Sequence, residues 1–415
     1  MRRPPRRRSA RLHSCRSRRV SQARFPATFM RGGTSRALFF RVEDLPTDPA
    51  ARDRLFLAAL GGPDPFGRQL DGLGGGSSST SKVAIIGPSP GSGIDVAYTF
   101  AQVDVRNPRV DYRGNCGNIS SAVGPYAIEE GLARGGRVTF LNTNTNKRIV
   151  AEVPLDGASM PATAGDFVLP GVAGTGARIT LDFLDPGGAA TGRLLPTGNA
   201  VDRLVLDGGR SIEASLVDAT NPMVFVRASD LGLTGIEDPR GLDDDRVLMA
   251  RLEAIRAAGA VAMGVAATPV EATARSPAVP KIALVAPPRP FHDLAGNAIG
   301  AAQCDLVTRV VSMGVIHRAV ALTAAMCLAV AARLEGTIPA EIAGQFAPGA
   351  DVRIGHPSGV LPLAADVRDG RALSVRAYRT ARRLMEGFVR VPEAVLRDPE
   401  FFRDRIGVSM ATVAD

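Results

Sequence analysis

The chain has 415 residues, which is more than one compact domain usually holds and therefore predicts two domains. Hydrophobic residues make up 45% and charged residues 22%, a balance that excludes a wholly disordered chain, and four cysteines exclude a scaffold built on disulfides. Tryptophan is absent and aromatic residues make up only 5%, which argues against a surface that stacks nucleic-acid bases.

The net charge of +9 is concentrated in an arginine-rich tail, residues 1–24. This tail has ten arginines and no acidic residue, and the rest of the chain carries 40 basic and 41 acidic residues, a net charge of −1. Three interpretations remain open: a start assigned too far upstream, a disordered arm that binds polyanions, and a transit peptide. The apolar segment that follows the basic residues of a secretory signal is missing here. No uncharged apolar stretch reaches the roughly 18–20 residues that a membrane helix needs. We therefore expect a cytoplasmic protein.

In the first half, strands alternate with helices. Order is predicted to begin near Phe25 with two strands around a Gly-Gly turn, and residues 49–60 predict a short amphipathic helix. A glycine- and serine-rich loop, Gly72–Ser81, leads through Lys82 into the apolar strand VAIIG. The remaining elements are an alternating strand over 95–105, an apolar helix over about 119–132 and a hairpin over 137–153.

The second half follows the same pattern. Residues 317–334 are almost uncharged and too few to span a bilayer, so they predict a helix buried at the centre of a domain. The chain is expected to end with a strand near 371–379 and a polar helix. The other predicted elements are strands over 178–185, 203–207, 211–217 and 281–287, a helix over 243–257, and a strand-rich stretch that carries GHPSG at 355–359.

The Gly72–Ser81 loop and Lys82 form a candidate site for an anion. A nucleotide-binding P-loop needs Gly-Lys-Ser/Thr before a helix, whereas Lys82 enters a strand, so that function is excluded. Backbone N–H groups and hydroxyls beside a lysine can hold carboxylates. A solvated surface loop is the alternative. The candidate residues of the loop are Gly75, Gly76, Ser77 and Thr80.

The motif GNCGN places Cys116 directly before the first apolar helix. A helix N-terminus stabilises a thiolate and binds anions, so Cys116 is a candidate general base beside a carboxylate site. The alternative is a small buried cysteine in a tight turn. Cys327 lies within the second apolar helix and is expected to be a core residue.

A second set of candidates surrounds the second apolar helix. Ser312, Met313 and Gly314 are expected to precede this helix as GNCGN precedes the first, with His317 opening it, and Ser358 and Gly359 lie in the GHPSG turn. Structural roles for both histidines, His317 and His356, remain alternatives. The histidines lack the spacing of metal ligands, and the absence of a glycine-rich fingerprint between a strand and a helix leaves no support for a dinucleotide site.

With these motifs, the sequence resembles the PrpF family, which includes 2-methylaconitate isomerases and 4-oxalomesaconate tautomerases. The resemblance covers about residues 25–392, and the ordered combination of RGGTSR, GGG-S-S-TSK and GNCGN is its most specific part. The further matching segments are LPTGN, VPKIALVAPP, SMGVIHRA and GHPSG.

The resemblance implies an α+β, diaminopimelate-epimerase-like fold with two pseudo-symmetric domains, each a mostly antiparallel sheet wrapped around a central helix. We expect the N-terminal domain to comprise residues 25–190 and 375–415, and the C-terminal domain residues 191–374. Both central helices would point their N-termini at one cleft between the domains. The family needs no cofactor and no metal.

The resemblance also implies roles for individual residues. Lys82 and Cys116 match the family's proton-transfer positions, with the base and the acid unassigned. Ser35, together with Asn115, Gly117 and Asn118 of GNCGN, matches its substrate-binding surface.

Epimerases of this fold have a cysteine before each central helix, whereas this chain has none at the second position. A symmetric two-thiol racemisation is therefore disfavoured, and a proton shift along an unsaturated acid fits better. We expect an isomerase of a small unsaturated tricarboxylate, similar to 2-methylaconitate isomerase. The alternative is a 4-oxalomesaconate keto–enol tautomerase. The segment SMG resembles the 2-methylaconitate isomerases, whereas HRA followed by AxTxA resembles the oxalomesaconate tautomerases, so both substrates stay open.

An amino-acid epimerase and a polyanion-binding protein are less favoured. The expected partner is the tricarboxylate, with no membrane and no nucleic acid bound by the folded body, and a homodimer is the default expectation for the oligomeric state.

Overall fold

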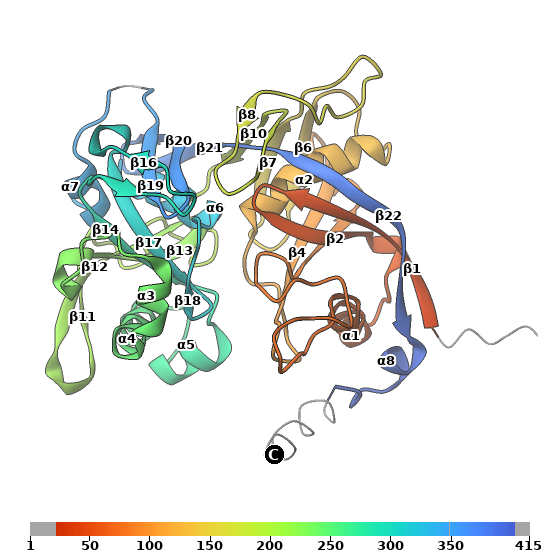
Figure 1. Cartoon of the computed structure of the whole chain (residues 1–415), viewed down its shortest axis with the longest axis horizontal. Coiled ribbons are helices and arrows are strands. Elements are labelled where there is room, and N and C mark those ends of the chain that lie inside the picture. Colours follow the sequence, from red (N-terminus) through yellow and green to blue (C-terminus); the bar gives the residue numbers. More distant parts are fainter. Residues whose placement is uncertain (1–21, 348, 403–415) are drawn as a thin grey trace, which may run out of the picture.

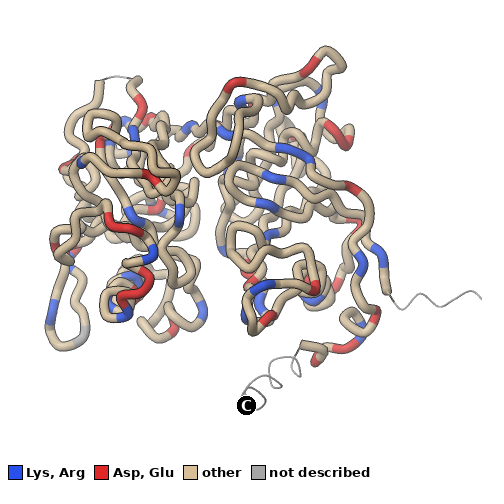
Figure 2. The backbone as a smooth tube through the Cα atoms, in the orientation of Figure 1, with Lys and Arg blue, Asp and Glu red and all other residues tan. Residues whose placement is uncertain are grey.

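The computed structural model describes residues 22–347 and 349–402, which form two lobes side by side (Figure 1). Most of the arginine-rich tail, residues 1–21, lies outside the described residues. The first strand includes the three residues before the predicted start at Phe25, because Gln22 already pairs with Pro392 in a sheet. Acidic and basic residues alternate along the backbone of both lobes (Figure 2), which agrees with the near-zero net charge of the chain without its tail.

The first lobe wraps a curved sheet around one buried helix, α2 (Gly117–Glu129). Helices α1 (Pro49–Leu60) and α8 (Glu393–Arg397) cover the outer face of this sheet and pack on each other. The strands of the lobe are β1 (Gln22–Gly32), β2 (Ser35–Arg41), β3 (Lys82–Gly87), β4 (Val96–Val103), β5 (Val110–Asp111), β6 (Arg137–Asn142), β7 (Lys147–Glu152), β8 (Phe167–Val168), β9 (Thr175–Gly176), β10 (Ile179–Leu184) and β22 (Ala381–Pro392).

The second lobe repeats this arrangement around α6 (Leu322–Ala331). Its strands are β11 (Asp202–Val205), β12 (Ser211–Ala219), β13 (Asn221–Arg227), β14 (Lys281–Ala286), β15 (Phe291–His292), β16 (Ala298–Ile299), β17 (Leu306–Ser312), β18 (Val315–Ile316), β19 (Val352–His356) and β20 (Gly359–Arg368). Its other helices are α3 (Pro239–Asp244), α4 (Arg246–Ala262), α5 (Pro269–Arg275) and α7 (Ile338–Ala343). Short 3-10 helices η1 (Val42–Asp44), η2 (Asp207–Gly209), η3 (Ala228–Leu231) and η4 (Ala301–Gln303) lie in connections.

One strand joins the two lobes. Strand β21 (Arg371–Arg379) pairs antiparallel with β20 on one side and with β10 on the other, so the main sheet runs through both lobes. Most of its pairings are antiparallel, and the parallel ones are β2–β3, β4–β6, β13–β14 and β17–β19, which confirms the predicted mostly antiparallel α+β architecture. The boundaries at residues 190/191 and 374/375 stay a prediction.

The two central helices are buried because they are apolar on every side. All ten residues of α6 and all but the last of the thirteen in α2 are buried, and their neighbours form one contiguous core that extends into both lobes. Among the described residues, no helix is both long and apolar enough to cross a bilayer.

Two predicted helices differ from the structure. The helix expected over 317–334 begins only at Leu322, because residues 312–316 form the β17–β18 hairpin and 317–321 have no regular structure. Within the described residues, the polar helix expected at the end of the chain is only the five-residue α8, and strand β22, which was not predicted, precedes it and pairs with β1 along its whole length. Strand β22 is exposed over much of its length, so it lacks the alternation that marks a strand in a sequence.

Candidate active site

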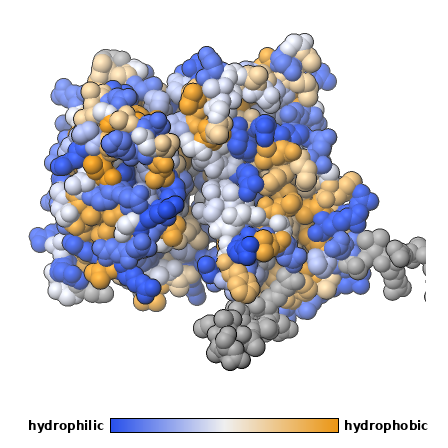
Figure 3. All heavy atoms as spheres, in the orientation of Figure 1, coloured by the Kyte–Doolittle hydropathy of each residue, from blue (hydrophilic) through white to orange (hydrophobic). Residues whose placement is uncertain are grey.

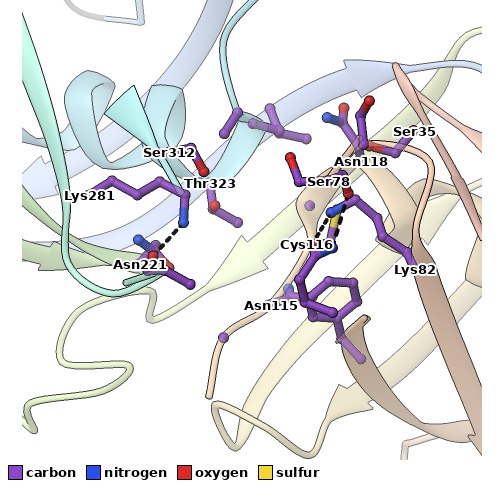
Figure 4. Close-up of a pocket in the computed structure, with 18 of the residues that line it drawn as sticks. Ser35, Ser78, Lys82, Asn115, Cys116, Asn118, Asn221, Lys281, Ser312 and Thr323 are labelled. Carbon is purple, nitrogen blue, oxygen red and sulfur yellow. Dashed lines mark hydrogen bonds between the residues drawn. The ribbon is translucent and has the colours of Figure 1, made fainter. Parts of the chain in front are cut away.

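A small cavity of about 80 Å³ lies between the lobes, with walls from both (Figure 4). The first lobe contributes residues of β2, β3, β4 and the start of α2, and the second lobe contributes residues of β14, β17 and the start of α6. The space-filling view shows the furrow between the lobes (Figure 3). The lining residues used below are Ser35, Ser78, Ser79, Lys82, Phe100, Gln102, Asp111, Asn115, Cys116, Gly117, Asn118, Asn221, Lys281, Ser312, Met313, His317, Ala321, Leu322 and Thr323.

Helix α2 presents its N-terminus to this cavity. Cys116 is the N-cap residue, and no side chain caps the helix; the first N–H to bond within the helix is that of Ser120, which donates to the Cys116 carbonyl at 2.9 Å. The N–H groups of the preceding turn therefore have no acceptor within the helix. They and the helix dipole form a site that favours an anion.

Helix α6 presents its N-terminus to the same cavity. Ala321 is its N-cap residue, again without a side-chain cap, and the first N–H bond within the helix runs from Ala325 to the Ala321 carbonyl. The two helix ends touch: a Cβ added at Gly117 would lie 3.1 Å from Leu322 Cδ2 and 3.2 Å from Met326 Cε. A side chain at position 117 would therefore crowd Leu322 and Met326, and glycine lets two positive helix ends converge closely on one small volume.

Lys82 and Cys116 lie together in this cavity (Figure 4). The Lys82 Nζ donates to Gln102 Oε1 at 2.6 Å and lies 5.1 Å from the centre of the Phe100 ring. Burial lowers the pKa of Lys82, while the charge of Cys116 and a hydrogen bond to it oppose this shift. The lowered pKa brings the lysine closer to the range in which it can exchange a proton near neutral pH.

Asn118 connects the GNCGN motif to the first hairpin. Its Oδ1 accepts a hydrogen bond of 3.0 Å from the buried Arg379 Nε, and its Nδ2 donates to Thr34 Oγ1 at 3.1 Å. Gly33 lies at φ +52°, and a Cβ there would lie 2.4 Å from Asn118 Oδ1. The hairpin glycine of RGGTSR thus leaves room for the start of α2, and Ser35, two residues later, lines the cavity.

Asn115 is the other asparagine of the motif. It is buried, and its Oδ1 accepts a hydrogen bond of 3.2 Å from Ser120 Oγ in the first turn of α2.

The Gly72–Ser81 loop contributes different residues from those predicted. Gly75, Gly76, Ser77 and Thr80 do not line the 80 Å³ cavity, whereas Ser78 and Ser79 do. The predicted residues build the loop: the Gly76 N–H and Ser81 Oγ both donate to Gln69 Oε1, at 2.9 and 2.6 Å. Gly76 and Ser77 line a neighbouring cavity of about 610 Å³ at the lobe boundary, which shares Ser78, Gln102 and Met313 with the smaller one.

The second set of candidates is divided in the same way. Ser312, Met313 and His317 line the cavity, whereas Gly314, Ser358 and Gly359 do not. Ser312 ends β17, and Met313 and Gly314 form the turn to β18, so none of the three lies directly before α6. The Ser358 hydroxyl donates to the Arg318 carbonyl at 2.7 Å.

His317 precedes α6 by five residues and does not open it. Its Nδ1 accepts from the Ala319 N–H at 3.1 Å, and burial, with Lys82 and Lys281 nearby, lowers the pKa of His317 to about 4. The imidazole is therefore neutral at physiological pH.

Ser78 and Ser79 belong to the predicted loop but were not singled out within it. The other lining residues that the sequence analysis did not name as candidates are Gln102, Asp111, Asn221, Lys281 and Thr323. The sequence does contain a signal for Lys281, because this lysine directly precedes the apolar segment IALVA as Lys82 directly precedes VAIIG. Gln102 and Asn221 are single polar residues in strands and carry no such signal. Within the described residues, no group of three or more His, Cys, Asp or Glu side chains could hold a metal ion.

Residues 22–392 match the family described as "PrpF protein". The chain belongs to the PrpF family. It is 46% identical to a 3-methylitaconate isomerase of Eubacterium barkeri, over 90% of this chain and 99% of the relative. It is 41% identical to a 2-methyl-aconitate isomerase of Shewanella oneidensis, over 90% and 98%. It is also 41% identical to a (4E)-oxalomesaconate Delta-isomerase of Novosphingobium sp. strain KA1, over 88% and 96%.

Solved structures agree with these relatives. The crystal structure of a methylitaconate-delta-isomerase superposes with a TM-score of 0.76 at 45% identity, covering 91% of this chain and 98% of the other. A hydroxyproline epimerase from Agrobacterium vitis superposes with a TM-score of 0.51 at 11% identity, covering 89% and 93%, which supports the fold alone. The PrpF-family protein is thus an isomerase with the predicted epimerase-like fold.

Proposed function

We propose that this PrpF-family chain is a cofactor-independent isomerase that moves a proton and a double bond in a small unsaturated tricarboxylate, as 2-methylaconitate isomerases do. The observation that carries the proposal is the placement of Lys82 and Cys116 in one cavity, at the point where two uncapped helix N-termini converge. Relatives named for the tricarboxylates 2-methylaconitate and oxalomesaconate support this class of substrate, and a relative named for the unsaturated dicarboxylate 3-methylitaconate supports the same kind of reaction.

The proposed reaction begins when the base of the Lys82–Cys116 pair removes a proton from a carbon next to a carboxylate. The electron pair of the broken C–H bond delocalises over the adjacent double bond and the carboxylate oxygens. Backbone N–H groups at the starts of α2 and α6 stabilise the charge that develops on those oxygens. The proton then returns to a different carbon of the allylic system, or to the same carbon after the skeleton has rotated. The net reaction is an isomerisation.

A 4-oxalomesaconate tautomerase is the second candidate. The sequence AxTxA at Ala321–Ala325 favours it, because its Ala321 and Thr323 line the cavity, and a relative carries an oxalomesaconate name. The same Lys82–Cys116 pair would serve both reactions, since both move a proton at a carbon acid. A cytoplasmic location and a homodimer remain predictions from the sequence.

The experiment is proton NMR of the purified protein in D₂O with 2-methylaconitate, 4-oxalomesaconate and 3-methylitaconate in parallel. We expect 2-methylaconitate to be converted fastest, with deuterium appearing at the carbon that gains the proton. Faster conversion of 4-oxalomesaconate would establish the second candidate. If none of the three is converted and none exchanges a proton, the proposed function is wrong.

A further inference from the structure

Lys281 occupies in the second lobe the position that Lys82 occupies in the first. Strand β3 pairs parallel with β2 and antiparallel with β4, and β14 pairs parallel with β13 and antiparallel with β17. Lys82 is the first residue of β3 and lies opposite Ala37 of β2, and Lys281 is the first residue of β14 and lies opposite Met223 of β13. The two lysines are therefore related by the pseudo-symmetry of the lobes.

The same registers pair other residues of the cavity. Ser35 lies two residues before Ala37, and Asn221 lies two residues before Met223, so these two correspond. The N-cap residues of the central helices correspond as well, and they are Cys116 in the first lobe and Ala321 in the second. Both lobes therefore have the lysine, but only the first lobe has the cysteine. Lys281 thus has no thiol beside it that corresponds to Cys116.

Lys281 is a cation held at the wall opposite Lys82 (Figure 4). Its Nζ donates to the Ala278 carbonyl at 2.7 Å. Burial and the charges of Lys82 and Arg256 lower the pKa of Lys281 to about 8, while Cys116 and Asp111 act in the opposite direction. Asp111 is itself engaged by Arg113, at 2.8 Å between its Oδ2 and Nη2. Two ammonium groups therefore share a cavity of about 80 Å³, an arrangement that favours a ligand with several negative charges.

The segment that carries Lys281 is fixed from behind. Arg256 of α4 is buried, and its Nη1 donates to the carbonyls of Ser276 and Pro280, at 3.0 and 3.4 Å. Glu253 pairs with the same guanidinium through two hydrogen bonds of 2.7 Å. The lysine is thus presented by a rigid support, as a binding residue needs.

The use of lysine in this chain is selective. Of its 50 basic residues only three are lysines, Lys82, Lys147 and Lys281, and two of these three line the cavity. An ammonium is a compact charge that fits a small cavity, whereas a guanidinium needs more room and does not titrate.

We propose that Lys281 is a substrate-binding residue that holds a carboxylate of the substrate from the second lobe, while Lys82 and Cys116 transfer the proton at the other end. The inference rests on the proposed function, because it assumes a polycarboxylate substrate. The second lysine makes the site specific for substrates with a carboxylate at each end. Because the two lysines belong to different lobes, a bound substrate contacts both lobes at once.

The first experiment compares turnover by Lys281→Met and Lys281→Arg with the wild type on whichever substrate the NMR panel identifies. We expect KM to rise about 10- to 100-fold in Lys281→Met, since a charged hydrogen bond is lost, while kcat changes less than about fivefold. Lys281→Arg should recover part of the affinity. Lys147→Met is the matched control, because Lys147 lies outside the cavity and pairs with Asp185 at 3.5 Å. An unchanged KM, or a collapse of kcat at constant KM, would overturn the assignment.

The second experiment does not require turnover. With ¹³C-labelled lysine the protein gives three side-chain signals, and tricarballylate, a saturated tricarboxylate that cannot isomerise, is added as the probe. We expect the Lys82 and Lys281 signals to move and the Lys147 signal to stay. A response from Lys82 alone contradicts the role of Lys281. If both signals move but no candidate substrate is converted, the binding role stands and the proposed function fails.

Discussion

At the scale of single residues, Gln102 determines how Lys82 is presented to the cavity. Its Nε2 donates to the carbonyls of Ser78 and Ser81, at 3.1 and 3.0 Å, and this fixes the amide so that Oε1 faces Lys82 Nζ. Gln102 is therefore a positioning residue: it orients the ammonium and joins it to the Gly72–Ser81 loop.

Gln102→Glu tests this role. A carboxylate at 2.6 Å would stabilise the ammonium and raise the pKa of Lys82, so the limb of the pH–rate profile that Lys82 controls should move to higher pH by roughly 1 to 3 pH units. The measurement is kcat/KM against pH, with the exposed Gln303→Glu as control. An unshifted profile with full activity would mean that Gln102 does not act on Lys82.

The motifs of the sequence, through the PrpF resemblance, predicted Lys82 and Cys116 as a pair, and the structure places both in one cavity. The sequence could not identify Gln102, Asn221 or Lys281 as neighbours of that pair. These residues enter the cavity through strand register and through the contact between lobes, both of which join positions far apart in the chain.

At the scale of elements, the β1–β2 hairpin and the first turn of α2 form one unit. The Gly33 N–H donates to the Thr380 carbonyl at 2.9 Å, and its left-handed conformation brings the hairpin against Asn118. The turn that the RGGTSR motif predicts therefore also supports the GNCGN motif, which explains why the two motifs occur together in this chain.

Gly33→Ala should lower the free energy of unfolding more than Gly131→Ala. Both glycines have a positive φ, +52° and +69°, so both variants carry the strain of a left-handed alanine. Only at Gly33 would the new Cβ also collide with Asn118 Oδ1, whereas nothing lies within 4 Å at Gly131, and we expect an additional loss of about 1–3 kcal/mol. Urea unfolding measures the difference; equal losses would show that the collision relaxes freely.

The elements that were predicted poorly are those in which buried and exposed residues do not alternate regularly along the sequence. Strand β22 is exposed over much of its length and is defined by its pairing with β1. Residues 317–321 have no regular structure because they connect the β17–β18 hairpin to α6. The helix α6 itself was predicted, since an almost uncharged segment can only be buried.

At the scale of the whole molecule, buried histidine makes the fold sensitive to acid. His356 is 2% exposed, and its Nδ1 accepts from the Ser358 N–H at 3.1 Å. Burial, with the charges of Arg379, His317 and Arg309, lowers the pKa of His356 to about 3, and Asp293 opposes this only weakly. The folded state therefore holds this imidazole neutral.

His356→Asn should make stability less dependent on pH. The unfolded histidine binds a proton near pH 6.5 and the folded one only near pH 3, so its contribution is complete above pH 6.5 and is lost as the pH falls, by up to about 1.4 kcal/mol per pH unit. The free energy of unfolding, measured from pH 7.5 to 4.5, should fall less steeply in the variant than in the wild type or in a variant of the exposed His292. Parallel curves for all three would contradict the buried neutral state.

The central claim for this molecule is that Lys82 and Cys116, enclosed between two lobes, move a proton on a carbon acid. Its most direct test is the rate at which deuterium from D₂O enters the converted substrate, followed by proton NMR in the wild type, Cys116→Ala and Lys82→Met. The buried Cys304→Ala, which lies outside the cavity, is the control. We predict that the wild type and the control incorporate deuterium at similar rates and that both site variants are slower by about 10²- to 10⁴-fold. Deuterium incorporation by Cys116→Ala and Lys82→Met at the wild-type rate would contradict the claim.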